Sequence, residues 1–219
     1  MQTAPDTELI QLNNWTLRIR KTAHPSPRLL LLVHGLTGDE NSMWVFARDL
    51  PAHYWIIAPR APHTAEPSGY SWRTQPSSDF GRPSFEQLKD SAEALIHLVD
   101  QYQASAKIEA PVFDVMGFSQ GAAMSSVLTF LHPDRIRKLG ILAGFVPSGM
   151  EQLIAQRPLE GKSVFVAHGT KDETVPIDRA RASIEVLEQA GAHVTYCEDE
   201  VGHKVSLTCL HALRKFLAE

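Results

Sequence analysis

The strongest constraint on the fold is the regular alternation of strand-like and helix-like segments along the chain. Short apolar runs typical of buried strands occupy residues 28–33, 54–58, 112–116, 139–142, 164–167 and 194–197. Amphipathic segments with helical spacing occupy residues 85–99, 120–131, 177–190 and 205–217. This order predicts an α/β fold with a mostly parallel central sheet and helices on both faces.

Two segments depart from this rhythm. Apolar and polar residues alternate over residues 12–20, which predicts a half-buried or edge strand. Residues 60–83 have no period and are rich in Pro, Ser, Gly and Arg. A loop of this length is uncommon in a compact domain and is often functional, so a role near a site and a plain surface excursion both stay open. The 219 residues suit a single domain, residues 1–219, with no large cap domain.

The charge balance excludes several classes of function. Lys and Arg total 21 against 25 for Asp and Glu, so no basic field is available to bind nucleic acid. The longest aliphatic run, residues 29–33, is too short to cross a bilayer, so we expect no stable membrane insertion. The N-terminal residues have neither the basic nor the apolar region of a secretory signal. We therefore expect a cytoplasmic protein, and the sequence leaves a homodimer open.

The chain has two cysteines, Cys197 and Cys209, which are too few for a disulfide framework. Isolated cysteines pack as small apolar groups. We expect both to be small buried side chains in a reducing compartment, with a redox or catalytic role as the alternative.

The sharpest chemical signal is the motif Gly117-Phe118-Ser119-Gln120-Gly121, which follows a predicted strand and opens a predicted helix. A nucleophile elbow requires this context. The serine sits on a tight turn where larger side chains two residues to either side would collide, which explains both glycines. The turn places the Ser119 hydroxyl at a helix N-terminus, where the helix dipole favours developing negative charge. A plain glycine-rich turn is the alternative.

A serine nucleophile needs a base, and the base needs an orienting carboxylate. With a nucleophile elbow the chain order is Ser, then Asp or Glu, then His. His203 fits best because it follows Gly202 in the turn between the last predicted strand and the last helix, at the sheet edge that carries Ser119. The alternatives are His193, which begins a strand, and His211, which lies inside a helix.

Asp172 is the predicted acid because it stands in the loop after the penultimate strand, where a carboxylate reaches the base. Its competitors are Asp178, in the first turn of a helix, and Asp199, just after the last strand.

Acyl transfer also needs donors for the oxyanion. We expect the backbone N–H of Gln120, which follows the nucleophile, and that of Leu36, in the glycine-containing loop after the early buried strand. The neighbouring His34 is expected to be a structural hydrogen-bonding residue.

Several motifs together resemble a known family. They are His34-Gly35-Leu36, Gly117-Phe118-Ser119-Gln120-Gly121, His168-Gly169-Thr170-Lys171-Asp172 and Gly202-His203. In this combination the chain resembles the phospholipase/carboxylesterase family of α/β-hydrolases, which includes the acyl-protein thioesterases, from residue 29 to its end. The resemblance implies a compact α/β-hydrolase fold without a large cap and a Ser-Asp-His mechanism with no metal and no cofactor. It also implies oxyanion donors at Leu36 and Gln120 and a pocket wall near Val175.

We therefore expect a serine hydrolase that cleaves small-molecule carboxylic esters, and thioesters as a second class, through an acyl-enzyme intermediate. Bulky apolar loop residues, among them Trp72, Phe145 and Val175, predict a modest hydrophobic recess for short-to-medium acyl chains. Two alternatives stay open. One is a dienelactone-hydrolase-like enzyme for small lactones, although that group usually has cysteine at the elbow. The other is a non-catalytic hydrolase-fold binding protein.

Overall fold

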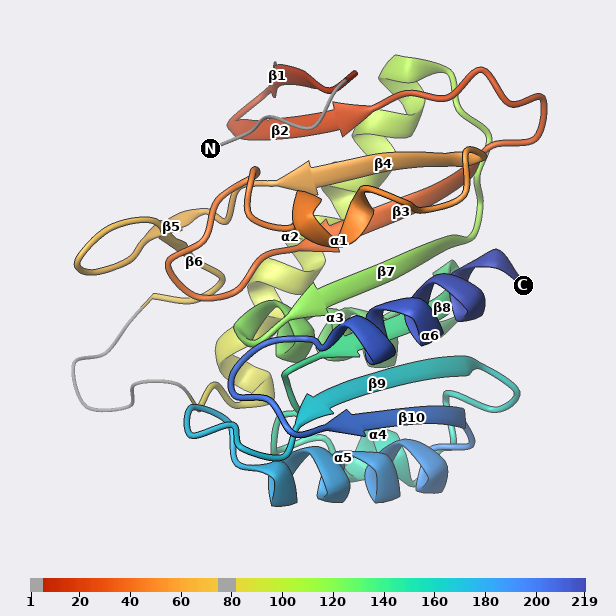
Figure 1. The fold of residues 1–219 in the computed structure, drawn as a ribbon. Coiled ribbons are helices and arrows are strands. Elements are labelled where there is room, and N and C mark those ends of the chain that lie inside the picture. The colour runs from red at the N-terminus through yellow and green to blue at the C-terminus, as the bar shows by residue number, and fades with distance from the viewer. Residues whose placement is uncertain (1–5, 75–81) are drawn as a thin grey trace.

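In a computed structural model that describes residues 6–74 and 82–219, eight strands form one twisted sheet (Figure 1). In spatial order the strands are β1 (Glu8–Leu12), β2 (Trp15–Arg20), β4 (Tyr54–Pro59), β3 (Arg28–Val33), β7 (Phe113–Phe118), β8 (Ile136–Leu142), β9 (Ser163–Gly169) and β10 (His193–Asp199). All pairings from β4 to β10 are parallel, whereas β2 pairs antiparallel with both β1 and β4. The prediction of a mostly parallel sheet is confirmed.

Helices cover both faces of this sheet (Figure 1). They are α1 (Trp44–Ala47), α2 (Phe85–Ala106), α3 (Gln120–Leu131), α4 (Glu151–Ile154), α5 (Ile177–Gln189) and α6 (Leu207–Ala218), with a 3₁₀ turn at Pro133–Arg135. One hydrophobic cluster packs α2, α3 and α5 against the sheet, and a second packs α1 and α6 against its other face. Successive strand residues serve different faces, so in β3 Leu31 enters the first cluster and Leu32 the second. Among the described residues, none of the helices is long and apolar enough to cross a membrane.

The two edges of the sheet differ from the sequence-based expectation. Residues 12–20 do not form one strand, because the chain turns at Asn13 between β1 and β2. Asn13 has a φ of 51°, a left-handed conformation that asparagine tolerates better than most residues. At the other edge, β10 is only half-buried, although residues 194–197 predicted a covered strand. The apolar and β-branched residues of this strand do not show from the sequence that it lies at the edge of the sheet, with none of the described strands beside it on one side.

The long loop folds onto the end of β3. Within it, β5 (His63–Thr64) and β6 (Tyr70–Ser71) form a short antiparallel pair. Thr37 N–H donates to Tyr70 O and Tyr70 N–H donates to Gly38 O, both at 3.0 Å. Residues 75–81 of the predicted loop lie outside the described residues. The described part borders the loop that follows β3, which favours a functional role for this segment.

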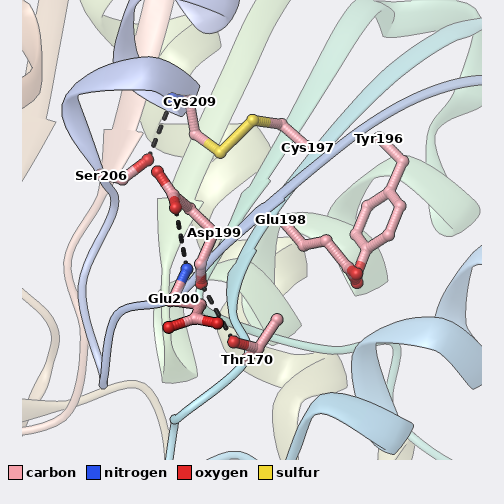
Figure 2. Close-up of a disulfide and its surroundings, with 8 residues drawn as sticks. All are labelled: Thr170, Tyr196, Cys197, Glu198, Asp199, Glu200, Ser206 and Cys209. Carbon is pink, nitrogen blue, oxygen red and sulfur yellow. Dashed lines mark hydrogen bonds between the residues drawn. A yellow bond between two sulfur atoms is a disulfide. The ribbon is translucent and has the colours of Figure 1, made fainter.

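Cys197 in β10 and Cys209 in α6 form a disulfide (Figure 2). The expectation that both are reduced thiols is therefore wrong. The helix packs back on β9 and β10 and brings the two Cα atoms to 5.6 Å from each other across a sequence separation of 12. The spacing of the two cysteines in the sequence does not show that α6 packs back on β10 and brings them together. Since disulfides are typical of oxidising compartments, this pair gives no support to the expected reducing one.

Candidate active site

Ser119 lies at the junction of β7 and α3, on the turn that its motif predicts. Its backbone has φ 55° and ψ −118°, a conformation that residues other than glycine rarely adopt. A Cβ on Gly117 would lie 2.1 Å from Gly121 O, and a Cβ on Gly121 would lie 2.1 Å from Val33 O. The two glycines are therefore required by the close approach of β3, β7 and α3, and this packing holds the strained serine in place.

His203 links Ser119 to a buried carboxylate. Its Nε2 lies 3.0 Å from Ser119 Oγ, and its Nδ1 lies 2.7 Å from Asp172 Oδ2. Because an ionised carboxylate only accepts hydrogen bonds, Nδ1 carries the proton and donates it to Asp172. Nε2 is then able to accept the hydrogen bond of the serine hydroxyl, which is the arrangement that proton removal requires.

Asp172 is itself fixed by its neighbours. Its Oδ1 accepts the backbone N–H groups of Thr174 and Val175, both at 2.9 Å. His168 Nε2 donates to Val175 O at 2.8 Å and lies 3.5 Å from Asp172 Oδ2. Burial lowers the pKa of His168 below its ordinary value, so this imidazole is neutral near pH 7. Sequence reasoning gave His168 no role of its own, although a histidine ending a buried strand four residues before the acid was a usable signal.

The competing residues lie outside this hydrogen-bonded chain. His193 and His211 are exposed. Asp178 is exposed in the first turn of α5, and Asp199 ends β10. Within the described ranges, none of these side chains hydrogen-bonds to the serine, histidine or aspartate of the chain.

Leu36 and Gln120, the predicted oxyanion donors, both line a cavity next to the serine. Gln120 is the first residue of α3, so its N–H has no carbonyl partner one turn earlier in the helix. The loop that carries Leu36 is tightly turned, because Gly38 N–H donates to Gly35 O at 3.0 Å. Leu36 and Gln120 therefore both lie beside the nucleophile, and the N–H of Gln120 is not used within its own helix.

His34 anchors the Leu36 loop. Ala61 N–H donates to His34 Nε2 at 3.0 Å, so the protonated nitrogen is Nδ1, which donates to Gly35 O at 2.7 Å. Burial lowers the pKa of His34, which keeps the imidazole neutral. These contacts confirm the predicted structural role of His34.

Two cavities meet at Ser119, Leu36 and His203. The first, of about 520 Å³, is bordered by the exposed Lys204 and largely by apolar side chains, namely Met43, Val45, Phe46, Phe118 and Val205. The second, of about 550 Å³, carries the charged side chains of Glu66 and Arg82 on its lining, together with Pro67, Phe145, Thr174 and Val175. Phe145 and Val175 therefore border a cavity that reaches the serine, and a substrate contact by either stays a prediction. The apolar residues of the first cavity were mostly missed, although Phe118 is part of the nucleophile motif.

Trp72 corrects the predicted pocket. Its side chain is 0% exposed and borders neither cavity, so it is no substrate contact. Its indole Nε1–H donates to His34 O at 2.7 Å, and its backbone N–H donates to Gln120 Oε1 at 2.9 Å. Because the indole N–H finds a carbonyl partner, the ring can be buried completely. Trp72 therefore supports the residues behind the site. The sequence alone does not show this role, because an aromatic residue in a loop can either line a pocket or be buried.

Comparison with known proteins agrees with this fold. Residues 14–219 match the Phospholipase/Carboxylesterase family, and the chain belongs to that family. It is 30% identical over 196 residues to acyl-protein thioesterase 1 of the yeast Debaryomyces hansenii, covering 80% of this chain and 82% of that protein. The fold is that of the α/β-hydrolases: a carboxylesterase structure from Mesorhizobium loti superimposes with a TM-score of 0.81 at 21% identity, covering 97% of this chain and 99% of that one.

A further relative qualifies what family membership says about activity. The chain is 24% identical over 196 residues to a rice protein named probable inactive carboxylesterase, covering 83% of this chain and 80% of that protein. The family is one of hydrolases, and its named members point to ester or thioester hydrolysis. Whether a given member is active has to be argued from its own residues.

Proposed function

We propose that this protein is a serine esterase that hydrolyses small carboxylic esters, with thioesters as a second class, through an acyl-enzyme on Ser119. The observation that carries the proposal is the hydrogen-bonded chain from Ser119 through His203 to Asp172, with His203 Nε2 3.0 Å from the serine Oγ. The strained backbone of Ser119 adds to it, because such strain is characteristic of functional sites and serves no purpose in a plain turn.

The reaction begins when Ser119 Oγ attacks the acyl carbon while His203 Nε2 takes the hydroxyl proton. The N–H groups of Leu36 and Gln120 donate to the oxyanion of the tetrahedral intermediate. The bond to the leaving group then breaks, and His203 gives its proton to the departing alcohol or thiol. Water next attacks the acyl-serine while His203 accepts one of its protons. As this second intermediate collapses, the bond to Ser119 Oγ breaks and His203 gives its proton to that oxygen, which releases the acid and restores the serine hydroxyl.

Asp172 acts on the base rather than on the substrate. It keeps the proton on Nδ1 of His203 and stabilises the imidazolium that forms during the attack. Its other oxygen is occupied by the N–H groups of Thr174 and Val175, so Oδ2 is the oxygen directed at His203. Neutral His168 packs beside the carboxylate without adding a second positive charge.

We assign the acyl chain to the apolar cavity. Its lining residues Phe46 and Phe118 have ring centroids 5.8 Å apart and form a continuous aromatic wall beside Ser119. Val45, at the rim, is 66% exposed, so the cavity reaches solvent within a short distance of the nucleophile. Each methylene that enters gains about 0.8 kcal/mol until the chain reaches water. This limit favours short-to-medium acyl chains.

A fluorophosphonate probe tests the proposal directly. We expect the purified protein to become labelled on Ser119, as located by peptide mass spectrometry, and the Ser119→Ala variant to remain unlabelled. A folded wild-type protein that resists the probe would instead favour the non-catalytic binding protein. A protein that is labelled but hydrolyses small lactones in preference to p-nitrophenyl esters would favour the dienelactone-hydrolase-like alternative.

Location and assembly are separate proposals. A cytoplasmic location keeps the support of the sequence composition, but the Cys197–Cys209 disulfide points toward an oxidising compartment. Cell fractionation combined with thiol trapping before lysis separates the two. A homodimer is likewise a proposal, and light scattering on the purified protein tests it.

A further inference from the structure

The second cavity carries positive charge close to the nucleophile. Arg82 lines this cavity together with Ser119 and Phe145. Arg179, in the first turn of α5, stacks its guanidinium over the Phe145 ring at 3.6 Å from the ring centroid. This end of α5 lies at the sheet edge where the parallel strands end, the same edge that carries the serine (Figure 1). Arg82 therefore borders the cavity directly, and Arg179, from a different segment, lies against the Phe145 ring that forms part of its wall.

Within residues 6–74 and 82–219, neither guanidinium has an acidic partner. Among the described residues no carboxylate oxygen lies within ion-pair distance of Arg82 or Arg179, although Arg179 is half-buried. Arg181, two residues further along α5, is by contrast paired with Glu198 at 3.1 Å. Burial lowers the pKa of Arg179, and the positive charge of Arg82 lowers it further. The two cations thus lie close enough to repel each other.

This arrangement costs free energy in the empty protein. A partly desolvated cation without a counter-ion is unfavourable, and a second cation nearby adds to the cost. Ion pairs elsewhere on this chain show that partners are available to its arginines. An anion in the cavity would offset both the desolvation and the repulsion, and arginine offers it paired N–H donors in a planar fork.

We propose that Arg82 and Arg179 form an anion subsite that selects esters carrying an ionised carboxylate away from the scissile bond. This inference rests on the proposed esterase function and specifies its substrate class. The apolar cavity takes the uncharged part of the substrate, and the second cavity takes the charged part. Glu66, an exposed carboxylate on the same lining, opposes such a ligand and limits the strength of the preference.

Matched ester pairs test the subsite. One pair compares the p-nitrophenyl half-ester of glutaric acid with p-nitrophenyl valerate, which places the charge on the acyl side. The other compares the butyrate ester of 4-hydroxybenzoate with that of methyl 4-hydroxybenzoate, which places it on the leaving group. For each pair, the measured quantity is kcat/KM for the charged ester divided by kcat/KM for the neutral ester. We expect this ratio to fall about tenfold in Arg179→Gln for one of the two pairs, a loss typical of a charge-assisted hydrogen bond. That pair also identifies which side of the substrate enters the second cavity.

Further variants separate charge from packing. Arg82→Gln should lower the ratio by about threefold, because Arg82 is exposed and more strongly screened. Glu66→Gln should raise the ratio, since it removes the opposing charge. Arg179→Lys should keep part of the preference because it keeps the charge, and Arg181→Gln, on the same helix, should leave the ratio unchanged. If Arg179→Gln, with a normal thermal melt, keeps the wild-type ratio in both pairs, the subsite does not exist.

Binding provides a readout that does not depend on turnover. In the Ser119→Ala background, calorimetry compares monomethyl glutarate with methyl valerate, and the butyrate ester of 4-hydroxybenzoate with that of methyl 4-hydroxybenzoate. In one of these pairs the charged ester should bind more tightly, and adding Arg179→Gln should remove the difference. Hydrolysis of neutral esters without this binding preference would overturn the subsite and leave the esterase proposal intact. The binding preference without any hydrolysis would overturn the esterase proposal and leave the subsite standing.

Discussion

Asp172 Oδ2 lies 2.7 Å from His203 Nδ1, and the carboxylate that makes this contact is completely buried. Its other oxygen already accepts two backbone N–H groups. In an Asp172→Asn variant the amide oxygen would keep those two donors, and the amide NH₂ would face His203. The imidazole would then have to accept on Nδ1 and carry its proton on Nε2, the nitrogen that must remove the serine proton.

We therefore expect Asp172→Asn to lower kcat by up to about 10⁴-fold with the fold retained. The matched control is Asp178→Asn, at an exposed position in α5, which should stay close to wild type. Ester hydrolysis and circular dichroism measure the two properties separately. Equal and mild losses in both variants would show that another group orients His203.

The two buried histidines predict a loss of stability in acid. Burial lowers the pKa of His34 and of His168 in the folded protein. Below the ordinary histidine pKa of about 6.5 the unfolded chain binds protons that the folded chain does not, so acid favours unfolding. The stabilising contribution is thus complete above that pH and is lost as the pH falls, by at most about 1.4 kcal/mol per pH unit for each histidine.

Urea unfolding between pH 7.5 and 5 measures this slope. His168→Asn should flatten the dependence of the unfolding free energy on pH, since it removes one of the histidines whose pKa is lowered by folding. His211→Asn, at an exposed position of α6, should leave it as in wild type. Parallel curves for wild type and His168→Asn would show that the buried imidazole is not proton-linked to folding.

The disulfide spans the loop that carries the base. Cys197 lies before His203 and Cys209 after it, and Ser206 between them caps α6 by accepting Cys209 N–H at 3.1 Å (Figure 2). Closing a loop of this size is worth about 3 kcal/mol in the chain-entropy account. We expect reduction by a dithiol, or the double variant Cys197→Ser and Cys209→Ser, to lower the free energy of unfolding by about that amount.

Esterase activity near the unfolding temperature should fall in parallel, because the cross-link that joins the two ends of the His203 loop would be lost. The double variant is also the control, since its activity and stability should no longer respond to reductant. Titration of two free thiols in the protein purified without reductant, or a wild-type stability indifferent to reductant, would contradict the disulfide.

The sequence predicted those features that depend on residues close together in the chain or on the order of its strands and helices. The position of Ser119 follows from local sterics, since only glycine fits at positions 117 and 121. The loops with Asp172 and His203 follow from the rule that parallel strands end at one edge of a sheet, so chain order was enough to bring them there. The burial of Trp72 and the packing of α6 beside Cys197 depend instead on how separate segments of the chain pack against one another. Neither feature produces a hydrophobic pattern in the sequence.

Trp72 gives the clearest reversal of an expectation. As a pocket residue, its replacement by alanine would alter acyl-chain preference more than stability. As a fully buried residue, Trp72→Ala should instead destabilise the fold by about 3–5 kcal/mol, measured by urea unfolding. Trp72→Phe should be milder, because it keeps a six-membered aromatic ring and loses the five-membered ring together with the hydrogen bond to His34 O. An unchanged unfolding free energy with a shifted chain-length optimum would restore the original interpretation.

Acyl-chain length is the property that the apolar cavity should control. Phe46 and Phe118 provide an aromatic wall near Ser119, while exposed Val45 marks the point where the cavity meets solvent. Additional methylenes gain about 0.8 kcal/mol each while they are covered and nothing beyond the rim. In a series of p-nitrophenyl esters we therefore expect kcat/KM to rise from acetate toward octanoate and to be lower for palmitate.

Phe46→Ala should reduce kcat/KM for octanoate more than for acetate, because only the longer chain reaches the lost ring. Leu9→Ala removes an exposed apolar side chain from β1, which borders neither cavity, and should leave the whole profile unchanged. A preference for palmitate that survives Phe46→Ala would show that the acyl chain binds elsewhere. The charged cavity beside Phe145 would then be the next place to look, and the half-ester substrates would distinguish a long apolar chain there from a short anionic one.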